Sequence, residues 1–315
     1  MKYFLYLYAM EQFKSTSLFK FKEKFNTDND CKKYLHHYKW KDGFKCKKCG
    51  HTQSWDNTVE YGKVCKKCRK IHSVTSDTIF HGIRFPLLKA FYIMFETMTS
   101  TKSMSALQIS RRYDINRKTA WLFMRKIRTS LKSSENYPMN NNNGSIIYVD
   151  EFVVGGYEEG KIGRTKDSKK RKMLMVVEAT NKNKIKRVYG VKIQAYSHIE
   201  LQEIFDKHIL QGSTVITDGW KGYNQIKGGY NIIKDVVGLK KISNPMNRMN
   251  QQFKSWVRGV FHKSSHQHIE TYLNEFCFKV NRSQWKDNMF HASILKALIH
   301  EPLTKKMIPD VKCYV

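Results

Sequence analysis

Two short cysteine motifs place the strongest constraint on the fold of this 315-residue chain. Residues 45–50 read KCKKCG and residues 64–69 read VCKKCR, so each motif carries two thiols on one tight turn. The segment between the motifs is short and strand-like. Four thiolates on two facing turns suit the tetrahedral coordination of Zn²⁺. The spacing therefore predicts a zinc ribbon over residues 41–75, with the ligands Cys46, Cys49, Cys65 and Cys68.

The residues around the motifs support ligation over four unliganded buried thiols. Four lysines flank the cysteines and favour their thiolate form: Lys47, Lys48, Lys66 and Lys67. His51 and His72 are close in sequence but superfluous to a complete ligand set. The remaining cysteines have no partner spacing and are expected to be ordinary packed thiols: Cys31, Cys277 and Cys313. Paired CxxC motifs indicate metal binding in a reducing compartment and not a disulfide framework.

The net charge of the chain points to a polyanionic partner. There are 57 Lys and Arg against 27 Asp and Glu, a formal charge of +30. Residues 1–140 contribute +17 and the remainder +13, so the excess is not one appended tail. Hydrophobic residues make up 41%, enough to bury a core. Nucleic acid is the expected partner, and an anionic membrane surface is the weaker alternative.

The ends of the chain carry few features. No run of eighteen apolar residues exists, so no membrane span is expected. The opening MKYFLYLYAM is short and lacks a cleavage site, which argues against a signal peptide and leaves Met10 as a second candidate start. Residues 1–40 are expected to be helical, and residues 301–315 to form a tail.

The stretch from 84 to 134 has the pattern of a helix-turn-helix region. Its middle helix is expected to end near Asp114, and Asn116 to cap the last helix. That last helix carries Lys126 and the predicted DNA-binding residues Arg117, Lys118, Thr119 and Arg125. The alternative is a helical hairpin with a solvated basic face. The Asn-rich residues 135–145 are expected to form a structureless linker.

From residue 146 to 300 the pattern changes to that of a mixed α/β domain. Three strands are expected first, then the amphipathic segment HIELQEIFDKHIL, two more strands and further helices. Three antiparallel strands followed by helix-linked strands is the ribonuclease-H-like order. In that order the first and fourth strands are neighbours at the sheet centre.

One acid lies on each of these two strands. Asp150 lies in YVDEF and Asp218 ends VITDGW, each after a β-branched apolar run. Carboxylates that converge there suit one or two Mg²⁺ ions, which can act on a phosphodiester. The alternative for either acid alone is a strand-end turn residue. Glu151 is expected to point to the other face by strand alternation.

Several long motifs together resemble those of DDE-type transposases of bacterial insertion sequences, in the branch related to eukaryotic Merlin elements. The resemblance rests on the cysteine motifs, TIFHGIRFPL, VDEFVVGGYEEGKIGRTKDSKKRK, TDGWKGY and FKSWVRGVFHKSSHQHIETYLNEF. It implies binding of element ends in double-stranded DNA, strand cleavage and transfer dependent on Mg²⁺ or Mn²⁺, and a homo-oligomer on DNA without a membrane. It also implies a location on the nucleoid in a bacterium, or in the nucleus for a Merlin-type element.

Carried over by motif, the resemblance implies Asp150 and Asp218 as the first two catalytic acids. The family's third acid lies seven residues before a lysine, and Lys254 matches that lysine. The residue seven positions back is Asn247, the expected third ligand, although a neutral amide stabilises less charge. Asn250, one turn on, and Glu275, on the next helix, remain alternatives. Three alternative functions also remain open: a decayed copy, a non-catalytic DNA-binding regulator and a nuclease without strand transfer.

Four further features have open roles. Lys254 is interpreted as a phosphate contact or a solvated lysine, and His262 as a contact to phosphate or metal or a packing residue. The basic hairpin KIGRTKDSKKRK, with Lys169, Lys170 and Arg171, is predicted to clamp DNA. Trp220 and Tyr223 are candidates either for stacking on a splayed base or for the core.

Overall fold

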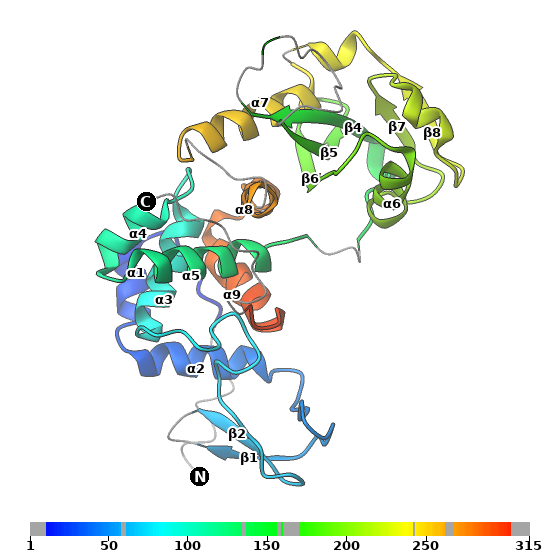
Figure 1. Ribbon diagram of the computed structural model, residues 1–315. Helices are drawn as coiled ribbons and strands as arrows, with labels where there is room; N and C mark the ends of the chain where they lie inside the picture. Colours follow the sequence, from blue (N-terminus) through cyan, green and yellow to red (C-terminus); the bar gives the residue numbers. More distant parts are fainter. Residues whose placement is uncertain are drawn as a thin grey trace. The chain divides into compact units, whose positions relative to one another are not determined.

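The computed structural model describes residues 11–57, 61–133, 137–155, 159, 170–241, 243–261 and 268–303. The chain divides into two compact units (Figure 1). The first comprises residues 1–131 and 282–315, and the second comprises residues 132–281. No helix among the described residues is long and apolar enough to cross a membrane.

The core of the first unit is a cluster of aromatic rings on four helices. These are α1 (Leu18–Lys24), α2 (Asp28–Lys39), α3 (Leu87–Thr99) and α9 (Met289–Ile299). Phe290 of α9 lies 5.1 Å from Phe21 and 5.6 Å from Phe91, measured between ring centroids. Because this packing ties α9 to α2 and α3, residues from 282 onward group with the first unit. The sequence had instead extended the core domain to residue 300.

Polar side chains fix where the first helices begin. Thr27 and Asp30 form a reciprocal capping box at the start of α2. Helix α3 begins after Pro86, which supplies no side-chain cap. Asp28 supplies one from α2, since its Oδ1 accepts the backbone N–H of Leu88 at 2.8 Å. One acid thus joins two helices of the unit.

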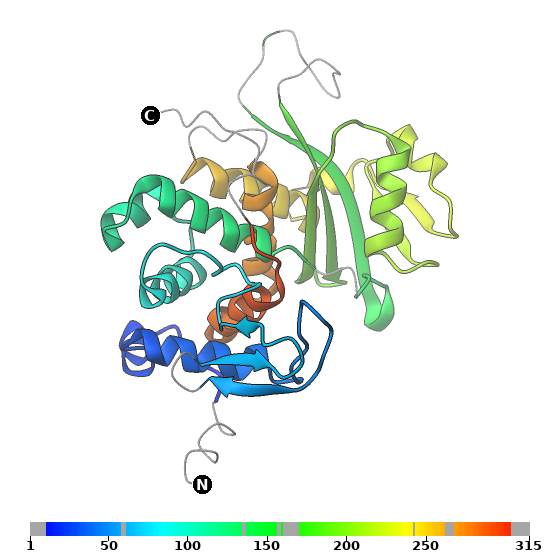
Figure 2. The ribbon, with the colours of Figure 1, turned by 60° about the horizontal axis from the view of Figure 1, so that its bottom comes forward.

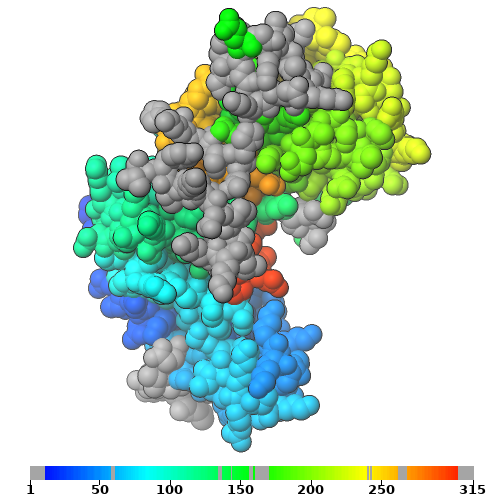
Figure 3. Space-filling model, viewed as in Figure 1, coloured from blue at the N-terminus to red at the C-terminus, as the bar shows by residue number. Residues whose placement is uncertain are grey.

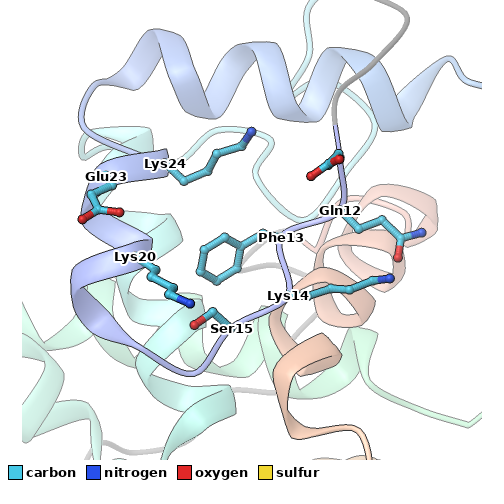
Figure 4. A pocket seen from close by; sticks show the side chains of 8 residues that line it. Gln12, Phe13, Lys14, Ser15, Lys20, Glu23 and Lys24 are labelled. Atoms are coloured by element: carbon cyan, nitrogen blue, oxygen red, sulfur yellow. The ribbon is translucent and has the colours of Figure 1, made fainter.

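Phe13, which precedes α1, also packs into this aromatic core. Its ring lies 5.5 Å from that of Phe21 and 5.8 Å from that of Phe290. A hollow surrounds this segment (Figure 4), and its lining carries side chains of both charges: Glu11, Lys14, Lys20, Glu23 and Lys24. The mixed lining favours neither an anion nor a cation.

Two further helices of the first unit form the predicted helix-turn-helix. Helix α4 (Ala106–Tyr113) ends at Asp114, which has a left-handed backbone with φ of 47°. Helix α5 (Arg117–Ser130) begins at Asn116, whose Oδ1 accepts the backbone N–H of Lys118 at 2.8 Å. The sequence therefore placed both the end of one helix and the cap of the next correctly.

The ribbon is a small antiparallel sheet in the same unit. Its strands are β1 (Ser54–Asn57), β2 (Gly62–Cys65) and β3 (Ile71–His72), in the order β1-β2-β3. Trp55 pairs with Val64 and Asp56 with Lys63. Since neighbouring residues of a strand point to opposite faces, Trp55 and Asp56 face different sides of the ribbon.

The second unit contains a five-stranded sheet in the order β6-β5-β4-β7-β8. Its strands are β4 (Ser145–Val154), β5 (Arg171–Thr180), β6 (Ile185–Lys192), β7 (Thr214–Thr217) and β8 (Asn231–Lys234). The pairs β4–β5 and β5–β6 are antiparallel, whereas β4–β7 and β7–β8 are parallel. The first and fourth strands are thus neighbours, which confirms the ribonuclease-H-like order predicted from the sequence.

Helices cover both faces of this sheet (Figure 2). Helix α6 (His198–His208) packs on the face that carries Ile147 and Val149 of β4. Helices α7 (Pro245–Arg258) and α8 (Ile269–Asn281) pack on the face that carries Tyr148 and Phe152. Both faces of β4 are therefore apolar, so a polar residue on this strand is unfavourable unless it has a specific role.

The segment before β4 is more ordered than the predicted structureless linker. Met139 is 2% exposed and bridges to Ile209, with its N–H bonded to the carbonyl of His208 at 2.7 Å. Asn141 donates through Nδ2 to the carbonyl of Thr214 at 3.1 Å. These contacts attach residues 139–145 to the second unit.

Candidate catalytic and zinc centres

The register between β4 and β7 sets Asp150 and Asp218 at the same height. Tyr148 pairs with Ile216, and each acid lies two residues further along its strand direction. Because the strands are parallel, the side chains of both acids emerge at the same edge of the sheet. The convergence expected from the sequence is therefore present.

Glu151 leaves β4 on the other face, as alternation predicts, but its carboxylate reaches the two aspartates. One carboxylate oxygen each of Asp150, Glu151 and Asp218 lies within 4.8 Å of the others. Glu151 does leave β4 toward the α6 face, where Tyr223 lies. Strand β7 ends at Thr217, so beyond this point no strand separates the two faces. Three carboxylates so close repel one another unless a cation or proton lies between them.

Tyr223 lies directly beneath this acidic cluster. Burial raises the pKa of its hydroxyl, and the neighbouring charges of Glu151, Asp150 and Asp218 raise it further. Tyr223 is only 1% exposed, so the structure assigns it to the core and not to base stacking. Trp220 also packs against this core, 5.9 Å from Tyr223.

A tight turn fixes the orientation of Asp218. Its Oδ1 accepts the backbone N–H of Trp220 at 3.0 Å. Gly219 between them has φ of 82°, a conformation that favours glycine. One carboxylate oxygen is thus occupied by the turn, and the side chain is held in place for the cluster.

Asn250 of α7 approaches the cluster from the opposite face of the sheet. Its Nδ2 donates to Oδ2 of Asp150 at 2.9 Å, and the residue is 5% exposed. Its Oδ1 is buried and has no hydrogen-bond partner among the described residues. An amide oxygen is a ligand that Mg²⁺ accepts, and a buried one without a partner is costly to leave unsatisfied.

Asn247 lies one turn earlier on the same helix and has a different contact. Its Nδ2 donates to the carbonyl of Lys241 at 3.2 Å. It is half-buried. The structure therefore brings Asn250, the alternative from the sequence, next to the first acid.

The other candidates differ in their relation to the cluster. Lys254 lies over the ring of Phe152 at 5.7 Å; burial lowers its pKa, while attraction to Asp150 opposes that shift. Glu275 is fully buried and pairs with Lys279 at 3.2 Å, and it is not one of the three clustered acids. His262 lies outside the described residues.

The donor set at this edge fits a hard divalent cation. It consists of carboxylate and amide oxygens from three elements: Asp150 and Glu151 on β4, Asp218 after β7 and Asn250 on α7. Mg²⁺ and Mn²⁺ prefer such oxygen ligands. A cation bound there would relieve the repulsion among the carboxylates, and a half-turn of the Asn250 amide would direct its unsatisfied oxygen toward that cation.

The four predicted cysteine ligands also converge. Their sulfur atoms all lie within 4.8 Å of one another. Two of the distances, Cys46–Cys68 and Cys49–Cys65, are 3.6 Å between Sγ atoms. Tetrahedral Zn²⁺ with Zn–S bonds of about 2.3 Å requires sulfur atoms about 3.8 Å apart. The geometry therefore fits a structural zinc ion.

His72 is not one of the four clustered ligands, but it contacts one of them. Its Nε2 lies 3.4 Å from Sγ of Cys46, and its Nδ1 lies 3.8 Å from Asp77. Burial opposes ionisation of Cys46, but backbone N–H groups and His72 lower the pKa of this thiol to about 5. The histidine thus supports the ligand as a second contact, which spacing alone had not indicated.

The predicted DNA-binding residues of α5 differ in the solvent exposure of their side chains. Arg117 and Lys118 are exposed at its start, and Thr119 is half-buried. Arg125 is half-buried and lies over the ring of Trp121 at 5.9 Å. Lys126, in contrast, is buried and donates to the carbonyl of His81 at 2.8 Å. Lys126 is therefore a structural residue.

Little of the basic hairpin falls in the described part of the chain. Lys169 lies outside it, Lys170 directly precedes β5, and Arg171 begins that strand opposite Val154. Burial lowers the pKa of Arg171. The predicted DNA clamp stays a prediction.

Comparison with known proteins places the second unit in a family. Residues 143–281 match the family described as ISXO2-like transposase domain. None of the curated proteins compared matches the chain. Among solved structures, a chain from the crystal structure of a pre-cleavage Mos1 transpososome is similar. It is 7% identical, the match covers 62% of this chain and 75% of that one, and the TM-score is 0.20.

The matched residues contain the complete sheet and all three clustered acids. The resemblance to insertion-sequence DDE transposases stated from the sequence is thereby confirmed. The second unit thus contains an ISXO2-like transposase domain, which supports an insertion-sequence DDE transposase.

Proposed function

We propose that this protein binds the ends of a mobile DNA element and catalyses metal-dependent strand cleavage and transfer. The observation that carries the proposal is the convergence of Asp150, Asp218 and Asn250 at one edge of the sheet. A divalent cation held there supplies stabilisation of the negative charge that develops on a phosphodiester. The acids must stay ionised to hold it.

Each step is a phosphoryl transfer without a covalent enzyme intermediate. In cleavage, a water oxygen bonds to phosphorus, the bond from phosphorus to the 3′ oxygen breaks, and that oxygen leaves with a proton. In transfer, the freed 3′-OH gives up its proton and its oxygen bonds to the phosphorus of a target phosphodiester, while the bond from that phosphorus to the target's 3′ oxygen breaks and that oxygen leaves with a proton. Lys254, near Asp150, is placed to neutralise a phosphate oxygen of the strand.

We assign the third ligand position to Asn250 and not to Asn247. Asn250 contacts Asp150 and buries an amide oxygen that has no other described partner. Asn247 donates its amide to Lys241 instead. A neutral third ligand leaves the carboxylate charges of Asp150, Glu151 and Asp218 as the main attraction for the cation.

The amino-terminal unit is proposed to hold the DNA ends. The exposed Arg117 and Lys118 at the start of α5 suit contacts to a duplex. Because an element has two ends, we infer that at least two copies act together on DNA. Light scattering with and without end-bearing DNA tests this inference, and a single copy on paired ends contradicts it.

The function is tested with linear DNA that carries the ends of the element, in Mg²⁺ or Mn²⁺. We expect the wild type to nick and join strands, and Asp150→Ala and Asp218→Ala to lose both activities. Glu203→Ala, which removes an exposed acid of α6, is the charge-matched control. Cleavage by both aspartate variants at the wild-type rate rules the site out. Nicking without joining indicates a nuclease, and specific binding without nicking indicates a DNA-binding regulator.

A further inference from the structure

The two cysteine turns of the ribbon differ at one backbone position. Gly50 follows Cys49 with φ of 74°, and Arg69 follows Cys68 with φ of 59°. In both turns this residue donates its backbone N–H to the first cysteine, over 2.9 Å to Cys46 and 3.0 Å to Cys65. The positions are equivalent, and only the first carries the residue that this conformation favours.

An arginine in a left-handed backbone costs conformational free energy that glycine would not cost. The turn itself does not require the side chain, since the first turn forms without one. Strain of this kind is retained where the side chain has a separate use. The location of the Arg69 side chain shows what that use is.

The guanidinium of Arg69 lies over the indole of Trp55, with Cζ 4.4 Å from the ring centroid. Nζ of Lys66 is 6.0 Å from the same ring. Trp55 is 43% exposed, although a tryptophan in a strand is normally covered. An exposed indole thus supports two cations on one face of the ribbon. The ribbon forms the light-blue surface at the lower end of the first unit in Figure 3.

Positive charge is in large excess in the ribbon. Residues 41–75 contain nine Lys and Arg against three Asp and Glu. Asp56, on the opposite face, is already paired with Lys63 at 2.7 Å. No described acid pairs with Lys66 or Arg69. A guanidinium that stacks on a ring keeps its N–H edge available for an anion, and a planar fork fits phosphate.

We propose that Trp55, Lys66 and Arg69 form a binding surface for the phosphate backbone of duplex DNA, additional to the basic start of α5. The inference rests on the proposed function in one respect, namely that DNA is the partner. The indole restricts the guanidinium before DNA arrives, so little side-chain entropy is lost when the contact forms. The contact is sequence-independent, because it involves only phosphate.

The test compares full-length variants for binding to a labelled duplex at several salt concentrations. Arg69→Gly restores the favoured residue of the turn and removes the cation. We expect unchanged zinc content, a Tm at least equal to that of wild type, an affinity about tenfold lower, and a salt slope smaller by about 1. Trp55→Ala keeps both cations and should weaken binding with little change of slope.

Lys63→Ala is the matched control, because it also removes one positive charge from the ribbon, on the opposite face. It should leave the affinity closer to wild type than Arg69→Gly does. Wild-type affinity and slope in Arg69→Gly overturn the inference, as does a loss of zinc or Tm in that variant, which indicates a structural role. If Trp55→Ala loses affinity for single-stranded DNA but not for duplex DNA, the indole stacks on bases, and this result also overturns the inference.

The outcomes separate this inference from the proposed function. If the wild type binds and cleaves end-bearing DNA while Arg69→Gly does so equally well, only the ribbon surface is wrong. If the wild type binds no duplex, the proposed function fails first, and the ribbon surface fails with it.

Discussion

Asn250 donates its amide to Asp150 at 2.9 Å, and this bond links α7 to the centre of the sheet. The contact joins residues one hundred positions apart in the chain. It aligns the amide of α7 with the carboxylate that the parallel strands bring next to Asp218. When a cation is bound, rotation of the amide by half a turn would offer Oδ1 in place of Nδ2.

Asn250→Ala is expected to reduce strand cleavage by about 100-fold, the scale of lost metal-site contacts. Asn247→Ala, on the same helix, is the matched control and should change the rate by less than about threefold. Asn250→Asp should retain activity, because it restores an oxygen ligand. Single-turnover cleavage at varied Mg²⁺ measures this, and the reverse ranking of the two alanine variants would falsify the assignment.

Glu151→Gln removes one of three mutually repelling charges. We expect the metal-free protein to gain about 1 kcal/mol in its free energy of unfolding, and Mg²⁺ to raise its Tm less than it raises that of wild type. Thermal unfolding with and without Mg²⁺ provides the measurement. Glu203→Gln is the control on the exposed face of α6. An equal Mg²⁺-induced shift in Glu151→Gln would show that this carboxylate takes no part in the site.

Cys46→Ser is expected to lose the ribbon's zinc, because a hydroxyl does not replace a thiolate in a tetrahedral sulfur site. Metal analysis of the purified protein should show about one zinc per chain in wild type and little in the variant. Cys31→Ala alters a buried thiol outside the cluster and should leave the zinc content unchanged. Full zinc in Cys46→Ser would contradict the ligand set.

Two arginines of α5 are expected to differ in what they contribute, and the variants Arg117→Ala and Arg128→Met compare DNA affinity with protein stability. Arg117 is exposed, so its loss should weaken DNA binding without lowering Tm. Arg128 is 4% exposed and donates to Oγ of Ser103 at 3.0 Å and to the carbonyl of Met104 at 2.8 Å. Its loss should cost about 2 kcal/mol of stability. Equal effects of both variants on Tm would contradict this division.

His291 makes the first unit sensitive to acid. Burial, followed by the charges of Lys41 and Lys14, lowers its pKa from 6.5 to about 4, and its Nδ1 lies 2.6 Å from the hydroxyl of Tyr34. Between pH 6.5 and 4 the unfolded chain binds a proton that the folded chain does not. Stability is therefore full above pH 6.5 and falls as the pH decreases through that window, by about 2 kcal/mol between pH 7 and 5.

Urea unfolding of wild type and His291→Gln at both pH values isolates this contribution, since other groups titrate equally in the two proteins. The variant should lose about 2 kcal/mol less than wild type over that interval. An identical loss in both would assign the acid sensitivity to other residues.

The sheet could be predicted from the sequence because each strand has its own pattern and parallel neighbours follow from the strand order. Asp150 and Asp218 were found for the same reason, since both end buried apolar runs. The contact of Glu151 with the two aspartates was not predicted, because alternation describes only where a side chain leaves a strand. It does not describe how far a long side chain reaches past the end of the next strand.

Choosing between Asn247 and Asn250 required the packing of α7. The two residues are three positions apart and share one side of the helix, so periodicity cannot rank them. Met249 and Phe253 pack into the core and set the rotation of the helix, which turns Asn250 toward β4. The assignment of α9 failed similarly, because an apolar helix does not specify which core it completes.

The order of the two units along the chain has a consequence for synthesis. The second unit is complete when residue 281 leaves the ribosome, but the first still lacks α9, whose Phe290 fills its aromatic core. The second unit can therefore fold before the unit that contains the ribbon and helices α4 and α5. A chain that stops before α9 therefore carries a finished second unit but an aromatic core in the first unit that lacks Phe290.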